Sequence, residues 1–157
     1  MINLIAACSL NGVIGVSNKI PWNCPSDMKH FREMTKNSTV ILGRSTFESM
    51  GSKPLPKRRN LVITSRDLLD GVECYPSIQD ALNASSNDES IWFIGGSRIY
   101  EQSMQFADEI HLTIIPEIIN DINAVKFPWI NPEMFKVKEI KLLNPDENLK
   151  YVIYGKI

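Results

Sequence analysis

Short runs of apolar residues alternate along this sequence with stretches in which apolar residues recur every three or four positions. The first pattern is typical of buried β-strands and the second of amphipathic α-helices, because each follows the repeat of its own backbone. The strand-like runs are residues 2–8, 39–43, 60–65, 72–75, 91–94 and 109–115. The helix-like stretches are residues 25–36, 45–50, 77–84 and 97–105. This alternation favours parallel strands, since parallel neighbours need a crossover between them.

The C-terminal part of the sequence has a different pattern. Residues 135–143 and 150–156 are strand-like, and Asn144-Pro145-Asp146 between them is a turn signal. We therefore predict a mixed, mostly parallel α/β sheet of about eight strands, flanked by helices and ending in an antiparallel C-terminal strand. No internal repeat or low-complexity segment divides the sequence, so residues 1–157 are expected to form one domain.

Composition limits the classes of function. The net charge is −1, with 43% hydrophobic and 22% charged residues, which predicts a soluble globular protein whose partners are neither nucleic acid nor membrane. Three cysteines without metal-ligand spacing and only two histidines argue against a metal site. The cysteines are expected to be free thiols in a reducing compartment. Because no signal-peptide pattern or long apolar segment is present, we expect a cytoplasmic protein.

One acidic residue lies at the start of an apolar helical stripe. Pro25 suits the first helical position, where its missing N–H is harmless, and Asp27 then falls in the first turn. Asp27 and Phe31 are four residues apart and share a helix face. Partial desolvation of this carboxylate would raise its pKa toward the range in which it helps to move a proton. Position alone leaves an alternative open, in which Asp27 serves only the helix dipole and backbone N–H groups.

Three strand-like runs end in residues that suit phosphate groups. Gly43-Arg44-Ser45-Thr46 and Ile94-Gly95-Gly96-Ser97-Arg98 each join a strand to a helix, and Thr64-Ser65-Arg66 closes a third strand. They offer backbone N–H groups, hydroxyls and guanidinium groups, and adjacent glycines allow close approach of a ligand. Because ligands of open α/β sheets bind beyond the carboxyl ends of strands, we predict an extended ligand with more than one phosphate. Each segment taken alone is also compatible with an ordinary turn or a solvated surface.

Several other catalytic patterns are absent from the sequence. The glycines do not form Gly-x-Gly-x-x-Gly, and there is neither a Gly-Lys-Ser/Thr phosphate loop nor a Gly-x-Ser-x-Gly elbow. These absences argue against a Rossmann domain, a P-loop nucleotidase and a serine hydrolase. Of the two histidines, we interpret His30 as a partly exposed helix residue and His111 as a strand residue without a catalytic role.

Together, these motifs closely resemble dihydrofolate reductase of the monomeric chromosomal type, and the resemblance covers nearly the whole chain. It rests on the order and spacing of Leu4-Ile5-Ala6-Ala7, Gly12-Val13-Ile14-Gly15, Ile20-Pro21-Trp22-Asn23, Asp27, Val40-Ile41-Leu42-Gly43-Arg44-Ser45-Thr46-Phe47-Glu48-Ser49-Met50-Gly51, Leu55-Pro56-Lys57-Arg58, Ile94-Gly95-Gly96, Tyr100, Leu112-Thr113 and Phe127-Pro128. The resemblance implies a dihydrofolate-reductase-like fold and NADPH-dependent reduction of 7,8-dihydrofolate to tetrahydrofolate. It also implies a monomer that binds antifolates such as trimethoprim and methotrexate.

The resemblance further implies roles on the substrate side. Asp27 would bind the 2-amino group and ring N3 of the pterin and favour protonation at N5, with Thr113 as its hydrogen-bonded support and Trp22 as a further catalytic residue. Arg58, preferred to Arg59 because it keeps the Leu-Pro-x-Arg spacing, would pair with the α-carboxylate of the glutamate tail. The implied substrate-binding residues are Ile5, Ala6, Asp27, Met28, Phe31, Arg32, Leu55, Arg58, Ile94, Tyr100 and Thr113.

On the cofactor side, the resemblance implies that Arg44, Ser65 and Arg66 favour the 2′-phosphate of NADPH. The Gly95-Gly96 bond would be cis and would lie near the pyrophosphate, and residues 15–23 would form a lid. No metal is implied. The implied cofactor-binding residues are Ala7, Ile14, Ile20, Gly43, Arg44, Ser45, Thr46, Thr64, Ser65, Arg66, Ile94, Gly95, Gly96, Ser97, Arg98, Ile99 and Tyr100.

Four departures from the common pattern accompany this interpretation. Ser97 stands where a third glycine is frequent, and Ile20 replaces a commoner Met or Leu in the lid. Lys53 is an extra residue before Pro54-Leu55-Pro56. Residues 120–126 lack the usual Gly-Asp-Thr before Phe-Pro, with Asp121 as a candidate substitute.

Two alternative functions are weighed against this interpretation. One alternative is the pyrimidine reductase of riboflavin synthesis, which shares the fold; Pro21-Trp22 followed by Asp27 argues against it. The other is a catalytically silent nucleotide-binding module, which the intact acid, lid and Arg58 argue against.

Overall fold

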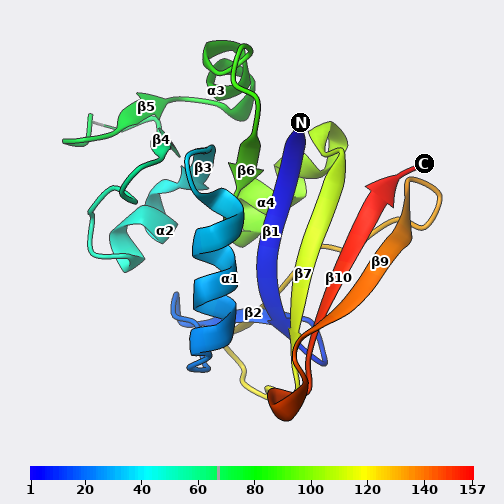
Figure 1. The fold of residues 1–157 in the computed structure, drawn as a ribbon. Helices are drawn as coiled ribbons and strands as arrows, with labels where there is room; N and C mark the ends of the chain where they lie inside the picture. The colour runs from blue at the N-terminus through cyan, green and yellow to red at the C-terminus, as the bar shows by residue number, and fades with distance from the viewer. Residues whose placement is uncertain (67) are drawn as a thin grey trace.

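The structure is a computed structural model that describes residues 1–66 and 68–157. In this part of the chain, eight strands form one sheet in the order β5-β4-β3-β6-β1-β7-β10-β9, with β5 and β9 at its edges (Figure 1). The strands are β1 (Ile2–Ser9), β3 (Thr39–Gly43), β4 (Arg59–Ile63), β5 (Glu73–Tyr75), β6 (Ile91–Phe93), β7 (Glu109–Ile115), β9 (Phe135–Asn144) and β10 (Leu149–Lys156). The helices are α1 (Pro25–Thr35), α2 (Arg44–Ser49), α3 (Ile78–Ala84) and α4 (Ser97–Ser103), with 3-10 turns η1 (Met104–Phe106) and η2 (Pro145–Glu147).

The pairing of the strands confirms the predicted mixed sheet. All pairings from β5 to β7 are parallel, and β10 is antiparallel to both of its neighbours, β7 and β9. The chain turns between β9 and β10 at η2, where the Asn144 side chain accepts a hydrogen bond from the backbone N–H of Asp146 (3.1 Å). Asn148 then adopts a left-handed conformation with φ 52°, which asparagine tolerates better than most residues.

Alternation of side chains along the central strands divides the helices between the two faces of the sheet. Ile41 of β3 belongs to the large apolar cluster that includes residues of α3 and α4. Its neighbours Val40 and Leu42 point the opposite way, Val40 toward Phe31 of α1 and Leu42 toward Phe47 of α2. Therefore α1 and α2 cover one face, and α3 and α4 cover the other. Strands that are covered on both faces lack polar alternation, which explains their continuous apolar sequences.

Two short strands are not predicted from the sequence. In the structure, β2 (Val13–Val16) and β8 (Ala124–Lys126) form a separate antiparallel pair. Each strand is short and its partner lies far away in the chain, so period-two alternation marks neither strand and no hairpin turn joins the two. The predicted loop 15–23 therefore begins inside a strand. The helix predicted over residues 97–105 is also shorter, because its last turn tightens into η1.

None of the described helices is both long and apolar enough to cross a membrane. Across residues 1–66 and 68–157, no group of three or more His, Cys, Asp or Glu side chains is placed to hold a metal ion. Cys8, Cys24 and Cys74 carry free thiols. Burial raises the pKa of the Cys8 thiol to about 11, so this cysteine stays protonated and unreactive near neutral pH.

Candidate active site

Asp27 lies in the first turn of α1 and directs its carboxyl group toward the sheet. The N-cap residue is Cys24, and no side chain caps this helix end. Thr113 of β7 instead donates a hydrogen bond to the Asp27 carboxylate. Burial is the largest influence and raises the pKa of Asp27, whereas the Thr113 hydrogen bond and the nearby His30 lower it. The net direction is upward, which agrees with the desolvation hypothesis rather than with a purely helix-capping acid.

An apolar cluster lies on the same face of the sheet as Thr113. Ile5 is buried in this cluster, and Phe31, Leu55 and Ile94 pack against it. Four of the implied substrate residues, from four separate segments, are therefore brought together next to α1. Side chains that exclude water from a carboxyl group are the physical cause of the raised pKa described above.

Other implied substrate residues are placed differently. Ala6 faces the opposite side of the sheet and packs against the large cluster beneath α3 and α4, so its side chain is remote from Asp27. Tyr100 of α4 is buried, and its hydroxyl donates a hydrogen bond to the carbonyl of Ile5 (2.7 Å). Trp22 is half-buried, whereas Met28 is 48% exposed and Arg32 is exposed. In this structure the region around Met28 and Trp22 is therefore open to solvent.

The three phosphate-suited segments meet, because β4, β3 and β6 are neighbours in the sheet. The backbone N–H of Gly43 donates a hydrogen bond to the carbonyl of Gly95 (2.9 Å). Arg44 Nη1 donates a hydrogen bond to Thr64 Oγ1 (3.3 Å), and Arg44 Nε lies 3.6 Å from Glu48 Oε1. Ser45, Ser65, Arg66 and Arg98 are exposed around these strand ends.

The Gly95-Gly96 pair presents backbone without side chains beside a hydroxyl group. Gly95 has φ +123°, and a Cβ atom there would lie 3.3 Å from the Tyr100 hydroxyl. A Cβ atom on Gly96 would lie 3.2 Å from Thr46 Oγ1. The peptide bond between the glycines is cis, as expected. A side chain at either position would therefore occupy the space next to the strand end, which glycine leaves open.

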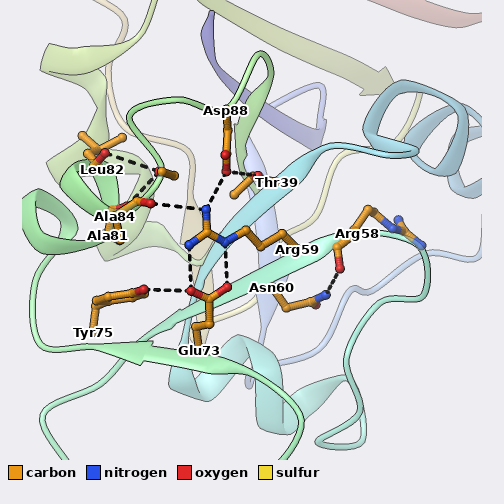
Figure 2. Close-up of polar contacts among 11 residues, drawn as sticks. Thr39, Arg58, Arg59, Asn60, Glu73, Tyr75, Ala81, Leu82, Ala84 and Asp88 are labelled. Atoms are coloured by element: carbon orange, nitrogen blue, oxygen red, sulfur yellow. Dashed lines mark hydrogen bonds and ion pairs between the residues drawn. The ribbon is translucent and has the colours of Figure 1, made fainter.

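Two adjacent arginines leave the start of β4 in different directions (Figure 2). Arg59 donates to both carboxylate oxygens of Glu73, at 2.6 and 2.7 Å, and to Asp88 Oδ2 at 2.9 Å. These hydrogen bonds raise the pKa of Arg59 and hold its guanidinium group between two acids. The side chain of Arg59 is thus committed to contacts within the protein, between β4, β5 and the loop after α3.

Arg58 lies toward α1 and donates to neutral oxygens. Its Nε donates to the carbonyl of Pro56 and its Nη1 donates to Thr35 Oγ1, both at 3.0 Å. The guanidinium carbon lies 6.0 Å from the centre of the Phe31 ring. Burial and the positive charge of Arg32 lower the pKa of Arg58. An anionic ligand group would relieve this electrostatic cost, so the geometry favours Arg58 over Arg59 as its partner.

Comparison with known proteins agrees with this arrangement. A family model described as dihydrofolate reductase matches residues 1–155. The chain belongs to the dihydrofolate reductase family. The dihydrofolate reductase of Haemophilus influenzae is 39% identical over 151 residues, which cover 95% of this chain and 92% of that protein. That of Buchnera aphidicola subsp. Acyrthosiphon pisum is 43% identical over 122 residues, 76% of each chain. A solved structure of dihydrofolate reductase from Enterococcus faecalis, complexed with NADP(H) and RAB-propyl, has a TM-score of 0.87 at 31% identity and covers 99% of this chain and 96% of that one.

Two of the departures from the common dihydrofolate reductase pattern, at Ser97 and at Asp121, have defined positions. Ser97 is the first residue of α4 and follows Gly96 directly. The Asp121 carboxylate accepts a hydrogen bond from the backbone N–H of Asn123 (2.8 Å), and its carbonyl accepts one from Ala124 (3.1 Å). Asp121 therefore stabilises the turn that leads into β8. Since β8 pairs with β2, whose last residues begin the segment 15–23, this turn is structurally connected to that segment.

A cluster of three side chains near Asp27, formed by His30, His111 and Tyr151, is not predicted from the sequence. His111 is only 4% exposed and is hydrogen bonded to the Tyr151 hydroxyl, and His30 packs edge-on against the Tyr151 ring. The sequence does indicate part of this cluster. His30 follows Asp27 by three residues and so shares its helix face, and His111 precedes Thr113 by two residues and so shares its strand face. Tyr151 is found only from the register of β10 on β7, which the sequence does not provide.

Proposed function

We infer that this chain reduces 7,8-dihydrofolate to 5,6,7,8-tetrahydrofolate with NADPH, the reaction that supplies reduced folate for one-carbon metabolism. The observation that carries this inference is the partly buried Asp27 carboxyl, hydrogen bonded to Thr113, in a chain that matches the family over residues 1–155. Protonation of a pterin ring nitrogen makes the adjacent carbon electrophilic. A partly desolvated acid with a raised pKa favours that protonation.

On the substrate side, Asp27 is proposed to bind the 2-amino group and N3 of the pterin and to favour the protonated state of N5. Thr113 holds the carboxyl in the orientation that this contact needs. Ile5 and Phe31 exclude water, which strengthens the electrostatic interaction between the carboxylate and a protonated ring. Arg58 is proposed to bind the α-carboxylate of the glutamate tail with two parallel N–H groups. These roles are supported by the placement of the five residues in and around α1.

On the cofactor side, the residues at the three strand ends fit the anionic groups of NADPH, which supplies the hydride when bound. Arg44 and Arg66, with Ser65, are proposed to bind the 2′-phosphate. The Thr46 hydroxyl and the backbone at Gly95 and Gly96 are proposed to bind the pyrophosphate, since a Cβ at either glycine would fill that space. The contacts that join β3, β4 and β6 support one continuous site.

We propose further that residues 15–23 close over the site as a lid, because this segment links β2 to α1 and carries the exposed Ile20. The chain is proposed to act as one domain and as a monomer, in the cytoplasm, where free thiols stay reduced. Antifolates are proposed to bind the Asp27 region, because cationic ring systems pair with a buried carboxylate.

The experiment that tests this function follows NADPH oxidation by absorbance, with dihydrofolate added to the purified chain and to its Asp27→Asn variant. The unsubstituted chain is expected to turn over. Asp27→Asn is expected to bind NADPH normally yet to lose about 10²–10⁴-fold of the turnover at neutral pH, the range for a lost acid–base group. Its turnover should recover as the pH falls, since solvent then supplies the proton that Asp27 favoured.

Each contrary result identifies a different error. Unchanged turnover of Asp27→Asn at neutral pH would refute the role of Asp27. Absence of dihydrofolate turnover by the unsubstituted chain, with NADPH still bound, would favour the pyrimidine reductase or a silent nucleotide-binding module. The relatives described above are dihydrofolate reductases, so neither alternative is favoured by similarity.

A further inference from the structure

Polar side chains form a layer between α1 and the sheet. Asp27 and His30 lie on one face of α1, because they are three residues apart. His111 and Thr113 lie on one face of β7, because they are two residues apart. Tyr151 of β10 is paired with Thr113 across the antiparallel ladder, so its side chain lies on the same face. We call these five residues the polar layer.

One side of the polar layer is a hydrogen-bonded chain that ends at the surface. The Tyr151 hydroxyl is hydrogen bonded to His111 Nδ1. His111 Nε2 lies 3.0 Å from Glu109 Oε1, and Lys138 Nζ donates a hydrogen bond to Glu109 Oε2 at 2.5 Å. Both ring nitrogens of His111 therefore have partners. The tyrosine ring against which His30 packs is thus held in place from the side of the layer remote from Asp27.

His30 has a different environment. Its ring lies 4.3 Å from the Tyr151 ring, centre to centre, with the planes inclined at 69°. Its Nε2 atom is buried and has no hydrogen-bond partner among residues 1–66 and 68–157. No hydrogen bond or ion pair joins this nitrogen to Asp27 in the described part of the chain. The Asp27 carboxyl, one helical turn earlier on the same face, therefore acts on the ring through space.

Charged and titratable groups face His30 from four elements. They are Asp27 and Glu33 of α1, Lys141 of β9, Tyr151 of β10 and His111 of β7. Burial is the largest influence and lowers the pKa of His30; the two acids raise it and the lysine lowers it. Burial conversely raises the pKa of Asp27. A protonated His30 lowers the pKa of Asp27, and an ionised Asp27 raises the pKa of His30, so the two titrations depend on each other.

We propose that His30 is a positioning residue whose protonation is linked through space to that of Asp27, so that Asp27 and His30 titrate as one coupled pair. The coupling itself needs no substrate, whereas its kinetic consequence rests on the proposed function. A proton taken from solvent by the imidazole leaves Asp27 ionised and paired with a cation. The carboxylate then remains available for the pterin edge at a lower pH than burial alone would allow.

The coupling is tested first without turnover, by nuclear magnetic resonance titration of the imidazole C–H signals in the full chain. The sequence contains only two histidines, so comparison with His30→Gln assigns the His30 signals. Asp27→Asn removes the negative charge that favours the imidazolium, and the His30 pKa is expected to fall by about one pH unit. Lys156→Gln serves as the control, because Lys156 is exposed on β10 and is not among the charged groups that act on His30; the His30 pKa should be unchanged in this variant.

The kinetic consequence is tested with the pH profile of kcat for dihydrofolate and NADPH. His30→Gln is expected to shift the apparent pKa of the profile upward, because the variant lacks the positive charge that lowers the pKa of Asp27. His30→Phe keeps an aromatic ring against Tyr151 and should give the same shift, which separates lost charge from lost packing. Lys156→Gln should give the profile of the unsubstituted chain.

The two measurements distinguish failure of this inference from failure of the proposed function. A His30 titration that is the same in Asp27→Asn and in the unsubstituted chain overturns the coupling, whatever the enzyme turns over. A coupled titration with an unchanged kcat profile in both His30 variants overturns the positioning role. If the unsubstituted chain does not reduce dihydrofolate, the proposed function fails, and the titration still decides whether the pair is coupled.

Discussion

At the scale of single residues, Asp27 carries a cost in stability that follows from its role. Its folded-state pKa lies above the ordinary value, chiefly because of burial. The folded state therefore prefers the protonated carboxyl, and this preference stabilises the fold below the ordinary pKa. The contribution is lost as the pH rises through the raised pKa. At neutral pH the ionised carboxylate is thus less well solvated in the folded chain than in the unfolded chain.

We predict that Asp27→Asn raises the free energy of unfolding at neutral pH, by about 0.5–2 kcal/mol, the range usual for a stabilising substitution at a functional site. The difference should shrink below about pH 4, where Asp27 is protonated in both states. Urea unfolding at neutral and acidic pH measures both quantities. A variant that is less stable than the unsubstituted chain at neutral pH would contradict the assignment of burial as the dominant influence on Asp27.

The adjacent arginines provide a second test at the residue scale. Arg58→Lys keeps the positive charge but loses the planar fork that binds a carboxylate with two parallel bonds. We predict that it raises KM for dihydrofolate by about 10–100-fold, the equivalent of one charge-assisted hydrogen bond, with little change in kcat. A dihydropterin without the glutamate tail should show no change in KM.

Arg59→Lys is the matched control for this prediction. Arg59 is bound to Glu73 and Asp88, so its replacement should lower the stability of the fold by about 1 kcal/mol and leave KM unchanged. Urea unfolding and the same steady-state assay measure the two effects. A larger KM change in Arg59→Lys than in Arg58→Lys would reverse the assignment of the two arginines.

At the scale of elements, the sequence predicts best what local pattern determines. The bounds of β3 and β7 agree with the predicted residues 39–43 and 109–115, because continuous apolar runs mark strands that are covered on both faces. The β2–β8 pair is not predicted, since only the folded chain brings Val13 beside Lys126. The same distinction holds in the site: the spacing from Asp27 to Phe31 is local, whereas the contact of Tyr151 with His111 depends on strand register.

The carboxyl ends of β3 and β4 are expected to determine cofactor preference together. Arg44 follows β3 and contacts Thr64 beyond β4, and Arg66 lies two residues further along. We predict that replacing both Arg44 and Arg66 by Gln raises the Kd for NADPH by roughly 100-fold or more, the equivalent of two charge-assisted hydrogen bonds. The Kd for NADH should change much less, because NADH lacks the 2′-phosphate. Equal weakening of both nucleotides, measured by fluorescence titration, would contradict the 2′-phosphate role.

At the scale of the whole molecule, the proposed site joins segments that are distant in the chain. Asp27 comes from α1, Thr113 from β7, and the cofactor residues from the ends of β3, β4 and β6. The parallel order β4-β3-β6-β1-β7 places all of these strands in one continuous part of the sheet. A ligand that contacts them binds only the folded chain, because unfolding separates its contacts. Ligand binding should therefore report on the integrity of the entire sheet.

We accordingly predict that NADPH at about 100 times its Kd stabilises the chain by about 2.7 kcal/mol through mass action. For a chain of this length, that stabilisation corresponds to a rise in Tm of about 5–10 °C. An antifolate at a saturating concentration should raise the Tm further.

In Asp27→Asn the rise in Tm with NADPH should persist, because the cofactor residues are intact. The additional rise with the antifolate should be greatly reduced, because the carboxylate is absent. Thermal unfolding of both chains, with and without each ligand, measures the four shifts. Loss of the NADPH-induced rise in Tm in Asp27→Asn would show that the substitution disturbs the sheet itself. The division of the site into an acid on α1 and a separate cofactor region at the strand ends would then be wrong.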